Sequence, residues 1–453
     1  MTIGRILDRI RRYPAEIAWV VLGQVVAAVC ALAGMRFLTR LLSPAEYGVL
    51  ALALTVGALM QQLVFGPVSN AVLRFYSASA ARGSLRMMLR AATALYGRAT
   101  IALFFLTAAG LVVRAMRYGW AGSGVIGVAA IFAVVLGVNG ALAAAHSAAR
   151  RRSVVAGHQA LGELLRFSVA VLVIRIVGSS GLAALVGFVI GIAACALSQG
   201  ILLRRVVERS TGVAETPGEE RTLSDAEWRR QLTQYAKPFA VWGIFTWAVL
   251  SADRWSLQLF QSTADVGRYA ALFQLGSYPV TMGASMLVQL AAPVLFSRAS
   301  DGSDPHRRQD SRRLNFLLTS LVLAATAIAT LAALLLHRQI FRLLVGEAYR
   351  SVSWLLPAVV LGAGLFAAGQ QLALTLQSDL QVKRLLGPKI GSAIAGVAFY
   401  FVGSRWWGMP GVVAAGVLFA AVHLLWIAHA SRTASTAPPP APAIPDAPPV
   451  PTA

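Results

Sequence analysis

The stretch YGWAGSGVIGVAAIFAVVLGVNGALAAAHSAA occupies positions 118–149 and contains no charged side chain. A helix needs about 20 apolar residues to cross a hydrocarbon core of about 30 Å, so this stretch is long enough to span a membrane. The whole chain has a similar character: 57% of its residues are hydrophobic, 13% are charged, and the mean hydropathy is +0.67. Because soluble domains carry about 25% charged residues, we predict an all-α polytopic membrane protein.

Further uncharged runs predict membrane helices on both sides of this stretch, at 17–35, 47–73, 99–113, 176–203, 238–252, 269–297, 314–336, 351–378, 390–404 and 406–431. One more helix is expected over 156–175, which is apolar except for Glu163 and Arg166. With this helix included, the basic connections after it stay on the cytoplasmic side. The expected total is about 12 transmembrane helices.

Lys and Arg gather in alternate connections between these runs, beginning with the segment before residue 17. Because cytoplasmic connections of membrane proteins are enriched in these residues, we expect both termini on the cytoplasmic side. The longest connection, 204–236, is predicted to be a cytoplasmic linker between two six-helix lobes at 1–203 and 237–431. The Pro- and Ala-rich tail at 432–453 is expected to be disordered.

The chain is strongly basic, with 40 Lys and Arg against 18 Asp and Glu and a net charge of +22. In a soluble protein this charge would favour a nucleic-acid partner, but here it lies mainly between membrane helices, so no nucleic acid is expected. Cys30 and Cys195 lie within apolar runs, which excludes a disulfide framework. No Gly-Lys dipeptide occurs, so the chain has no ATP-binding P-loop, and we predict neither a metal nor a cofactor.

A short sequence recurs at matching points of the two predicted lobes. SPAEYG at Ser43–Gly48 is followed much later by STADVG at Ser262–Gly267. We interpret this as an internal duplication. Because each predicted half has an even number of helices, the halves would be related by an axis along the membrane normal, as in many secondary transporters. Substrate is then expected between the halves, near the middle of the membrane.

Longer stretches around these motifs resemble a known family. RFLTRLLSPAEYGVLALA at Arg36–Ala53 and FGPVSNAVLRFYS at Phe65–Ser77 look like the opening of polysaccharide-export flippases. DRWSLQLFQSTADVGRYA at Asp253–Ala270 is similar to that family's second-half counterpart. These flippases belong to the superfamily of multidrug, oligosaccharidyl-lipid and polysaccharide exporters.

The resemblance implies a V-shaped, two-lobed flippase in the bacterial cytoplasmic (inner) membrane. Its substrate would be undecaprenyl-pyrophosphate-linked oligosaccharide, moved from the inner to the outer leaflet for assembly of O-antigen, exopolysaccharide or capsule. The implied partners are this lipid-linked oligosaccharide, the membrane lipids, and the polysaccharide polymerase and chain-length proteins. The peptidoglycan-precursor branch of the superfamily has an extra pair of helices that this sequence does not predict.

Arginines within or beside the predicted helices are the candidates for binding the pyrophosphate group. A charge near the bilayer centre costs about 2.5–3.5 kcal/mol on insertion scales, so an arginine there needs a cavity, a partner or a ligand. The guanidinium also offers a planar, permanently charged fork of donors to a phosphate. We therefore predict that the substrate cavity is lined by Arg36, Arg74, Arg98, Arg166 and Arg254. The alternative for Arg36, Arg74 and Arg254 is that each reaches the membrane interface.

Two acidic residues lie within predicted helices and are candidates for coupling transport to an ion. Glu163 and Asp253 could each carry a proton or sodium ion, because a buried carboxylate changes its affinity with its charge state. The alternatives are structural ion pairs, Glu163 with Arg166 on one helix face and Asp253 with Arg254 at the outer interface.

Two other functions remain open on the sequence. A membrane glycosyltransferase or polymerase would use the same lipid-linked sugars, but it typically needs acidic groups on large outer loops, and the outer loops here are short. A drug antiporter of the same superfamily would bind cations through intramembrane carboxylates, and the first predicted helix has none. A flippase, which is not an enzyme, is therefore the preferred interpretation.

Gly66 and Pro67, with Pro279 and Pro293, are candidate hinges for movement of the two lobes.

Overall fold

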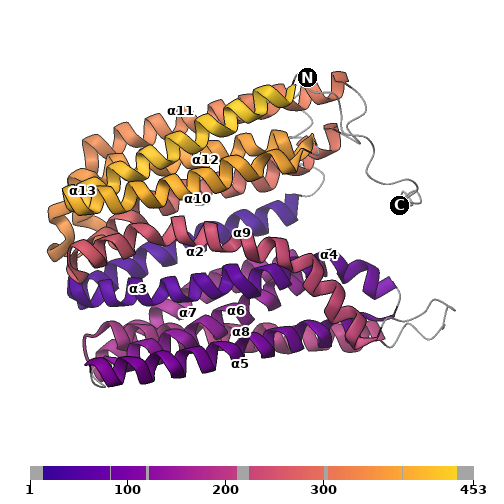
Figure 1. Cartoon of the computed structure of the whole chain (residues 1–453), viewed down its shortest axis with the longest axis horizontal. Helices are drawn as coiled ribbons and strands as arrows, with labels where there is room; N and C mark the ends of the chain where they lie inside the picture. The colour runs from indigo at the N-terminus through magenta and orange to yellow at the C-terminus, as the bar shows by residue number, and fades with distance from the viewer. Residues whose placement is uncertain are drawn as a thin grey trace.

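The computed structural model describes residues 14–81, 83–118, 122–211, 224–299, 305–379 and 381–435. Within these ranges every regular element is a helix (Figure 1). The α-helices are α2 (Pro14–Leu41), α3 (Pro44–Met60), α4 (Gly66–Ala81), α5 (Leu85–Tyr118), α6 (Ser123–Ala148), α7 (Arg152–Val177), α8 (Gly181–Thr211), α9 (Asp225–Phe260), α10 (Thr263–Ala299), α11 (Pro305–Leu344), α12 (Leu356–Ser378) and α13 (Leu386–Ser435). A π-helix, η1 (Gln61–Phe65), joins α3 to α4, and the 3₁₀ helices η2 (Glu347–Leu355) and η3 (Val382–Leu385) flank α12.

Many of these helices are long and apolar enough to cross a membrane. Among the described residues, eight segments meet that description, and several of them present large apolar side chains at their surface. The helices α7, α9 and α10 fall outside this set; each carries charged residues. The prediction of an all-helical, multi-pass membrane protein is therefore confirmed.

The long element α13 consists of two antiparallel helices. Its backbone leaves the helical region at Gly408, where φ is 60° and ψ is −138°, a conformation that favours glycine. Beyond this kink the chain folds back, so that Gly403 lies against the backbone of Gly411, and Gly396 lies against Phe419. The uncharged runs predicted at 390–404 and 406–431 correspond to these two arms.

The helices form two bundles that lie side by side. Figure 1 shows α10 to α13 stacked in one bundle and α3 to α8 in the other, with α9 passing between them. In the first bundle α12 packs along α11 and α13, and in the second α7 packs along α2 and α8. The two bundles meet chiefly where α3 packs along α10.

The repeated sequence motif is the point of closest approach between the bundles. Ser43 caps α3 by accepting a hydrogen bond from the Glu46 amide at 3.3 Å, and Ser262 accepts one from the Asp265 amide at 3.1 Å. Gly48 lies against the Thr263 carbonyl, and Gly267 lies in the same way against the Pro44 carbonyl. The contact is reciprocal, and a side chain at either glycine would collide with backbone that has no room to move.

The predicted linker over 204–236 is helical at both ends. The helix α8 continues to Thr211, and α9 begins at Asp225 behind a capping box formed by Ser224 and Glu227; 212–223 lie outside the described residues. The first turns of α9 bury Trp228 against α4 and α5. The predicted tail likewise begins as helix, because α13 runs to Ser435; 436–453 lie outside the described residues.

The predicted hinge at Gly66 and Pro67 coincides with a break in helical geometry. The π-helix η1 immediately precedes it, and the Gly66 amide donates to the carbonyl of Gln61, five residues earlier. Such π-turns are frequent at functional sites and bend a helix locally. At Pro279 and Pro293, in contrast, α10 continues without interruption.

Candidate functional site

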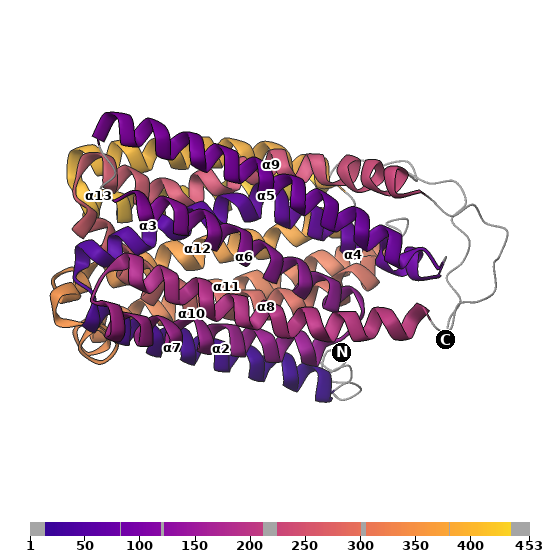
Figure 2. The ribbon, with the colours of Figure 1, turned by 90° about the horizontal axis from the view of Figure 1, so that it is seen from below.

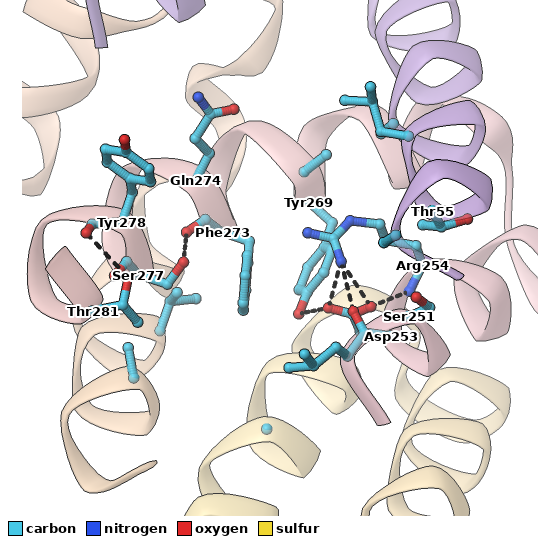
Figure 3. Close-up of a pocket in the computed structure, with 18 of the residues that line it drawn as sticks. Thr55, Ser251, Asp253, Arg254, Tyr269, Phe273, Gln274, Ser277, Tyr278 and Thr281 are labelled. Atoms are coloured by element: carbon cyan, nitrogen blue, oxygen red, sulfur yellow. Dashed lines mark hydrogen bonds and ion pairs between the residues drawn. The ribbon is translucent and has the colours of Figure 1, made fainter. Parts of the chain in front are cut away.

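A cavity of about 520 Å³ lies between the two bundles. Its walls come from α2, α3, η1, α7, α8, α9, α10, α12 and α13, so both halves of the chain contribute. Most of the lining is apolar or aromatic, and the charged residues in it are Arg166, Asp253 and Arg254. Figure 3 shows part of this lining, including Asp253 and Arg254.

One wall of the cavity is a stripe of polar and aromatic residues on α10. Four of them recur every four residues, at 269, 273, 277 and 281, and the other two, at 274 and 278, follow by one residue; all therefore lie on one broad helix face, because an α-helix has 3.6 residues per turn. Ser277 and Thr281 satisfy their hydroxyls within the helix, by donating to the carbonyls of Phe273 and Ser277 at 2.6 and 2.9 Å. The stripe consists of Tyr269, Phe273, Gln274, Ser277, Tyr278 and Thr281 (Figure 3).

The C-terminal half contributes a buried ion pair. The Arg254 guanidinium lies 3.2 Å from Asp253 Oδ1, the Arg254 amide donates to the same oxygen at 2.7 Å, and the Tyr269 hydroxyl donates to Oδ2 at 2.9 Å (Figure 3). The side chain of Asp253 is 3% exposed and that of Arg254 is 17% exposed. The guanidinium also lies over the Phe273 ring, 5.1 Å from its centroid. Asp253 is thus held on several sides.

The N-terminal half contributes a second, more open ion pair on α7. Arg166 donates to Glu163, which lies three residues earlier, and their side chains are 22% and 20% exposed. The guanidinium lies against the rings of both Phe167 and Phe188, at 4.7 and 5.1 Å from their centroids. Its Nε is buried and has no hydrogen-bond partner within the described part of the chain. Arg166 therefore lines the cavity and carries a buried donor that the described residues leave unsatisfied.

Hydrogen bonds between the bundles cross the same region. The Tyr47 hydroxyl on α3 lies 3.1 Å from Gln274 Oε1 on α10. The indole of Trp247 donates to the Thr55 carbonyl at 2.8 Å, and that of Trp255 lies 3.1 Å from the Thr55 hydroxyl. These contacts join α3 to α9 and α10 beside the repeat motif.

The residues that the sequence predicted for the cavity do not all meet there. The structure brings Arg166, Arg254 and Asp253 together in the lining, with Glu163 attached through its ion pair. Asp253 lies in the cavity lining rather than at an exposed interface, because the Tyr269 hydroxyl and the Arg254 amide compensate for its burial.

The other three predicted arginines lie outside the cavity. Arg36 donates to the carbonyl of Arg342 at 3.3 Å, and Arg74 is exposed on α4. Arg98 is exposed on α5 and lines a second pocket formed with α9. None of these three is part of the cavity lining.

Several polar residues of the lining were missed by the sequence interpretation, among them Tyr47, Tyr269, Gln274 and Tyr400. The helical spacing of the polar residues between 269 and 281 was a usable signal. No such signal existed for Tyr47 and Tyr400, since neither belongs to a run of closely spaced polar lining residues. Among the residues that the structure describes, no group of three or more His, Cys, Asp and Glu side chains is placed to hold a metal ion.

Comparison with known proteins rests on the fold. No protein-family model matches the chain, and no curated protein sequence matches it. A solved structure of the lipid II flippase MurJ in an inward closed conformation aligns with a TM-score of 0.66 at 10% identity, covering 92% of this chain and 87% of the flippase.

Multidrug resistance MATE family transporters of the MOP superfamily also align. The outward-facing form has a TM-score of 0.57 at 14% identity and covers 93% of this chain and 95% of the transporter. The inward-facing form has a TM-score of 0.54 at 14% identity, with 92% and 96% covered. These similar structures are transporters rather than enzymes. The chain therefore has the all-helical fold shared by the lipid II flippase MurJ and the MATE transporters of the MOP superfamily.

Proposed function

We propose that the chain is a flippase that moves undecaprenyl-pyrophosphate-linked oligosaccharide from the inner to the outer leaflet of the bacterial cytoplasmic membrane. The observation that carries the proposal is a cavity between the two halves with two arginines in its lining, Arg166 and Arg254. The product would enter assembly of O-antigen, exopolysaccharide or capsule. The fold supports the transport step, and the resemblance of Arg36–Ala53 to polysaccharide-export flippases supports the cargo.

Arg166 is the principal headgroup ligand in this proposal. Its Nε–H is a buried donor that no residue in the described ranges accepts from, and such a donor costs about 1–3 kcal/mol unless something accepts its hydrogen bond. A phosphate oxygen is a strong acceptor for a guanidinium. An anionic headgroup that accepts this hydrogen bond would therefore remove the penalty.

The rest of the lining suits the uncharged parts of the cargo. Rings such as Phe167, Phe273 and Tyr278 present apolar faces, while Gln274 and Thr281 offer hydrogen-bonding groups. Sugars present both apolar faces and hydroxyls. The cargo is larger than the cavity, so we propose that the glycan extends from it into the gap between the bundles.

We propose twelve transmembrane helices in two six-helix lobes, 1–203 and 237–431, with both termini cytoplasmic. Counting η1 with α3 and α4 as one passage, and the two arms of α13 as separate passages, gives this total. Transport would proceed by rocking of the lobes about the repeat-motif contact, with the π-turn at Gln61–Phe65 as a flexible point. Activity reporters fused at Gly218 and Ala434 test the topology: both are expected to report a cytoplasmic location, and an outer location of either contradicts it.

As the residue that couples transport to an ion, we propose Glu163 in preference to Asp253. Glu163 is 20% exposed and has one partner, Arg166, so it can change its charge state when a ligand competes for that arginine. Asp253 is held by Arg254 and Tyr269 and would have to lose several hydrogen bonds.

A drug exporter is the second candidate, and the fold similarity to MATE transporters favours it. A cationic drug would need a carboxylate available in the cavity. The carboxylate in the lining is that of Asp253, and Arg254 already neutralises it. The cavity therefore suits an anionic cargo better.

The decisive experiment measures on which leaflet the cargo accumulates. In a deletion strain, lipid-linked oligosaccharide should remain protected from an impermeant oxidant or lectin added outside the cytoplasmic membrane. Re-expression of the chain should restore accessibility, and Arg166→Ala should not. If the cargo stays accessible without the protein, another component flips it and the proposal is wrong; altered tolerance of toxic cations alone would indicate the drug exporter.

A further inference from the structure

A second pocket, of about 420 Å³, lies away from the central cavity, between α5 and the first turns of α9. Its lining consists of Leu95 and Arg98 on α5 together with Ala226, Arg229, Arg230, Thr233, Gln234 and Lys237 on α9. Figure 2 shows α5 and α9 running close together here, and the two helices contact each other.

The pocket is basic throughout. Arg98, Arg229, Arg230 and Lys237 supply four cations, and no carboxylate is part of the lining. None of the four forms an ion pair with any described residue. Four like charges around one hollow repel one another, and an anion bound among them would reduce that repulsion.

The helical phase of α9 explains why these cations converge. Trp228, Leu232 and Ala236 recur every four residues and are buried against α4 and α5. Arg229, Thr233 and Lys237 follow each of these by one residue and so lie on the neighbouring face. Burial of the apolar stripe therefore turns the basic stripe toward α5 and Arg98.

The pocket lies where the uncharged, apolar parts of α5 and α9 begin. Uncharged runs begin directly after Arg98, at 99–113, and directly after Lys237, at 238–252. Each run is about 22 Å long as a helix, somewhat less than the hydrocarbon core of a bilayer. Arg98 and Lys237 thus lie near one hydrocarbon boundary, where lipid phosphates are found.

We infer that this pocket binds the phosphate group of an anionic membrane lipid. Basic pockets between helices at the cytoplasmic face of a membrane protein are suited to such headgroups, and Arg and Lys both donate to phosphate oxygens. A free phosphate has the same chemistry, but a lipid is favoured by the position of the pocket beside the apolar runs. The site is separate from the cargo cavity, so the inference does not depend on the proposed cargo.

The four cations of this pocket differ from basic residues that only set the orientation of a membrane helix. Residues that only orient a helix need no common direction, since their task is to remain in water on one side. Here cations from two helices that are far apart in sequence meet around one hollow. The bound lipid would also bridge α5 to the part of α9 that links the two bundles.

The test uses the purified full-length chain in a neutral detergent and measures its thermal midpoint and its bound lipid by native mass spectrometry. The probes are phosphatidylglycerol, zwitterionic phosphatidylcholine and inorganic phosphate. The pocket variant combines Arg229→Gln, Arg230→Gln and Lys237→Gln. The matched control combines Arg90→Gln, Arg205→Gln and Arg432→Gln, which removes the same charge from exposed sites outside the pocket.

Phosphatidylglycerol is expected to raise the thermal midpoint of the unmodified chain and of the control, and to bind the pocket variant about 10- to 100-fold more weakly. The thermal midpoint without added lipid shows whether the pocket variant is folded, and Arg98→Gln alone is a milder second variant expected to weaken binding in the same direction. Equal weakening in the control overturns the inference, as does equal binding of phosphatidylcholine. Equal stabilisation by inorganic phosphate would overturn the assignment to a lipid.

Discussion

Each half of the chain brings an acid–arginine pair to the cavity, although Glu163 itself lies outside the lining, and the two pairs differ in how firmly they are held. Asp253 accepts hydrogen bonds from the Arg254 amide and guanidinium and from Tyr269, and its side chain is 3% exposed. Glu163 has Arg166 as its partner, and its side chain is 20% exposed.

The difference indicates a division of roles. A buried pair whose carboxylate accepts several hydrogen bonds fixes the geometry of the surrounding helices, because separating it exposes charges to an apolar environment. A pair that is about one fifth exposed, with a guanidinium Nε that no described residue satisfies, can exchange its partner for a ligand. The C-terminal pair is thus suited to structure, and the N-terminal pair to binding.

Asp253→Ala should be the most destabilising change, by about 3–5 kcal/mol, because it leaves Arg254 charged, largely buried and without its carboxylate. The free energy of unfolding, measured by denaturation in mixed micelles, tests this. The control is Asp265→Ala, which breaks the partly exposed pair with Arg268 and the hydrogen bond from the Ser262 hydroxyl at a cost of about 1 kcal/mol. Equal costs for the two variants would remove the distinction between a buried and an exposed pair.

Arg166→Ala should lower cargo binding about 10- to 100-fold, which corresponds to the loss of one charged hydrogen bond of about 1.5–3 kcal/mol. Arg166→Lys should recover part of the binding, because it keeps the charge but not the donor fork. The measurement is flipping of lipid-linked oligosaccharide in proteoliposomes, with Arg90→Ala as an exposed control. Normal flipping by Arg166→Ala would exclude Arg166 from the binding site.

Tyr269→Phe should destabilise the chain by about 1 kcal/mol, since it removes the hydrogen bond at 2.9 Å to Asp253. Tyr278→Phe is the matched control on the same helix face, because the Tyr278 hydroxyl makes no hydrogen bond to any described residue. A double-mutant cycle with Asp253→Asn should show coupling for Tyr269 and none for Tyr278. Absence of coupling for Tyr269 would contradict the proposed support of Asp253.

Glu163→Gln should have the smallest effect on stability, below about 1 kcal/mol, because the pair is partly exposed to water. Since the change frees Arg166, binding of an anionic headgroup should be retained or strengthened. Titration of the purified protein with an undecaprenyl pyrophosphate analogue measures this. Destabilisation as large as that of Asp253→Ala, or loss of binding, would mean that both pairs are structural.

The repeat motif shows how far sequence comparison reaches. The likeness of SPAEYG and STADVG was sufficient to suggest two related halves, and the structure adds that Gly48 and Gly267 face each other's motif. The acidic residues of the two copies have different partners. Glu46 Oε2 accepts from the Gly181 amide on α8 at 2.6 Å, whereas Asp265 pairs locally with Arg268. Similar local sequences produced the same backbone contact and different side-chain partners.

The sequence by itself determined that the chain is all-helical and membrane-spanning, and approximately where its helices lie, because hydrophobic length acts locally. The tertiary structure alone decided which charged residues share the cavity. Arg98 and Arg166 have equivalent apolar surroundings in the sequence, yet Arg166 reaches the cavity and Arg98 lines the second pocket. The direction of a helical side chain relative to distant helices depends on how those helices pack, and that packing arises from contacts between residues far apart in the chain.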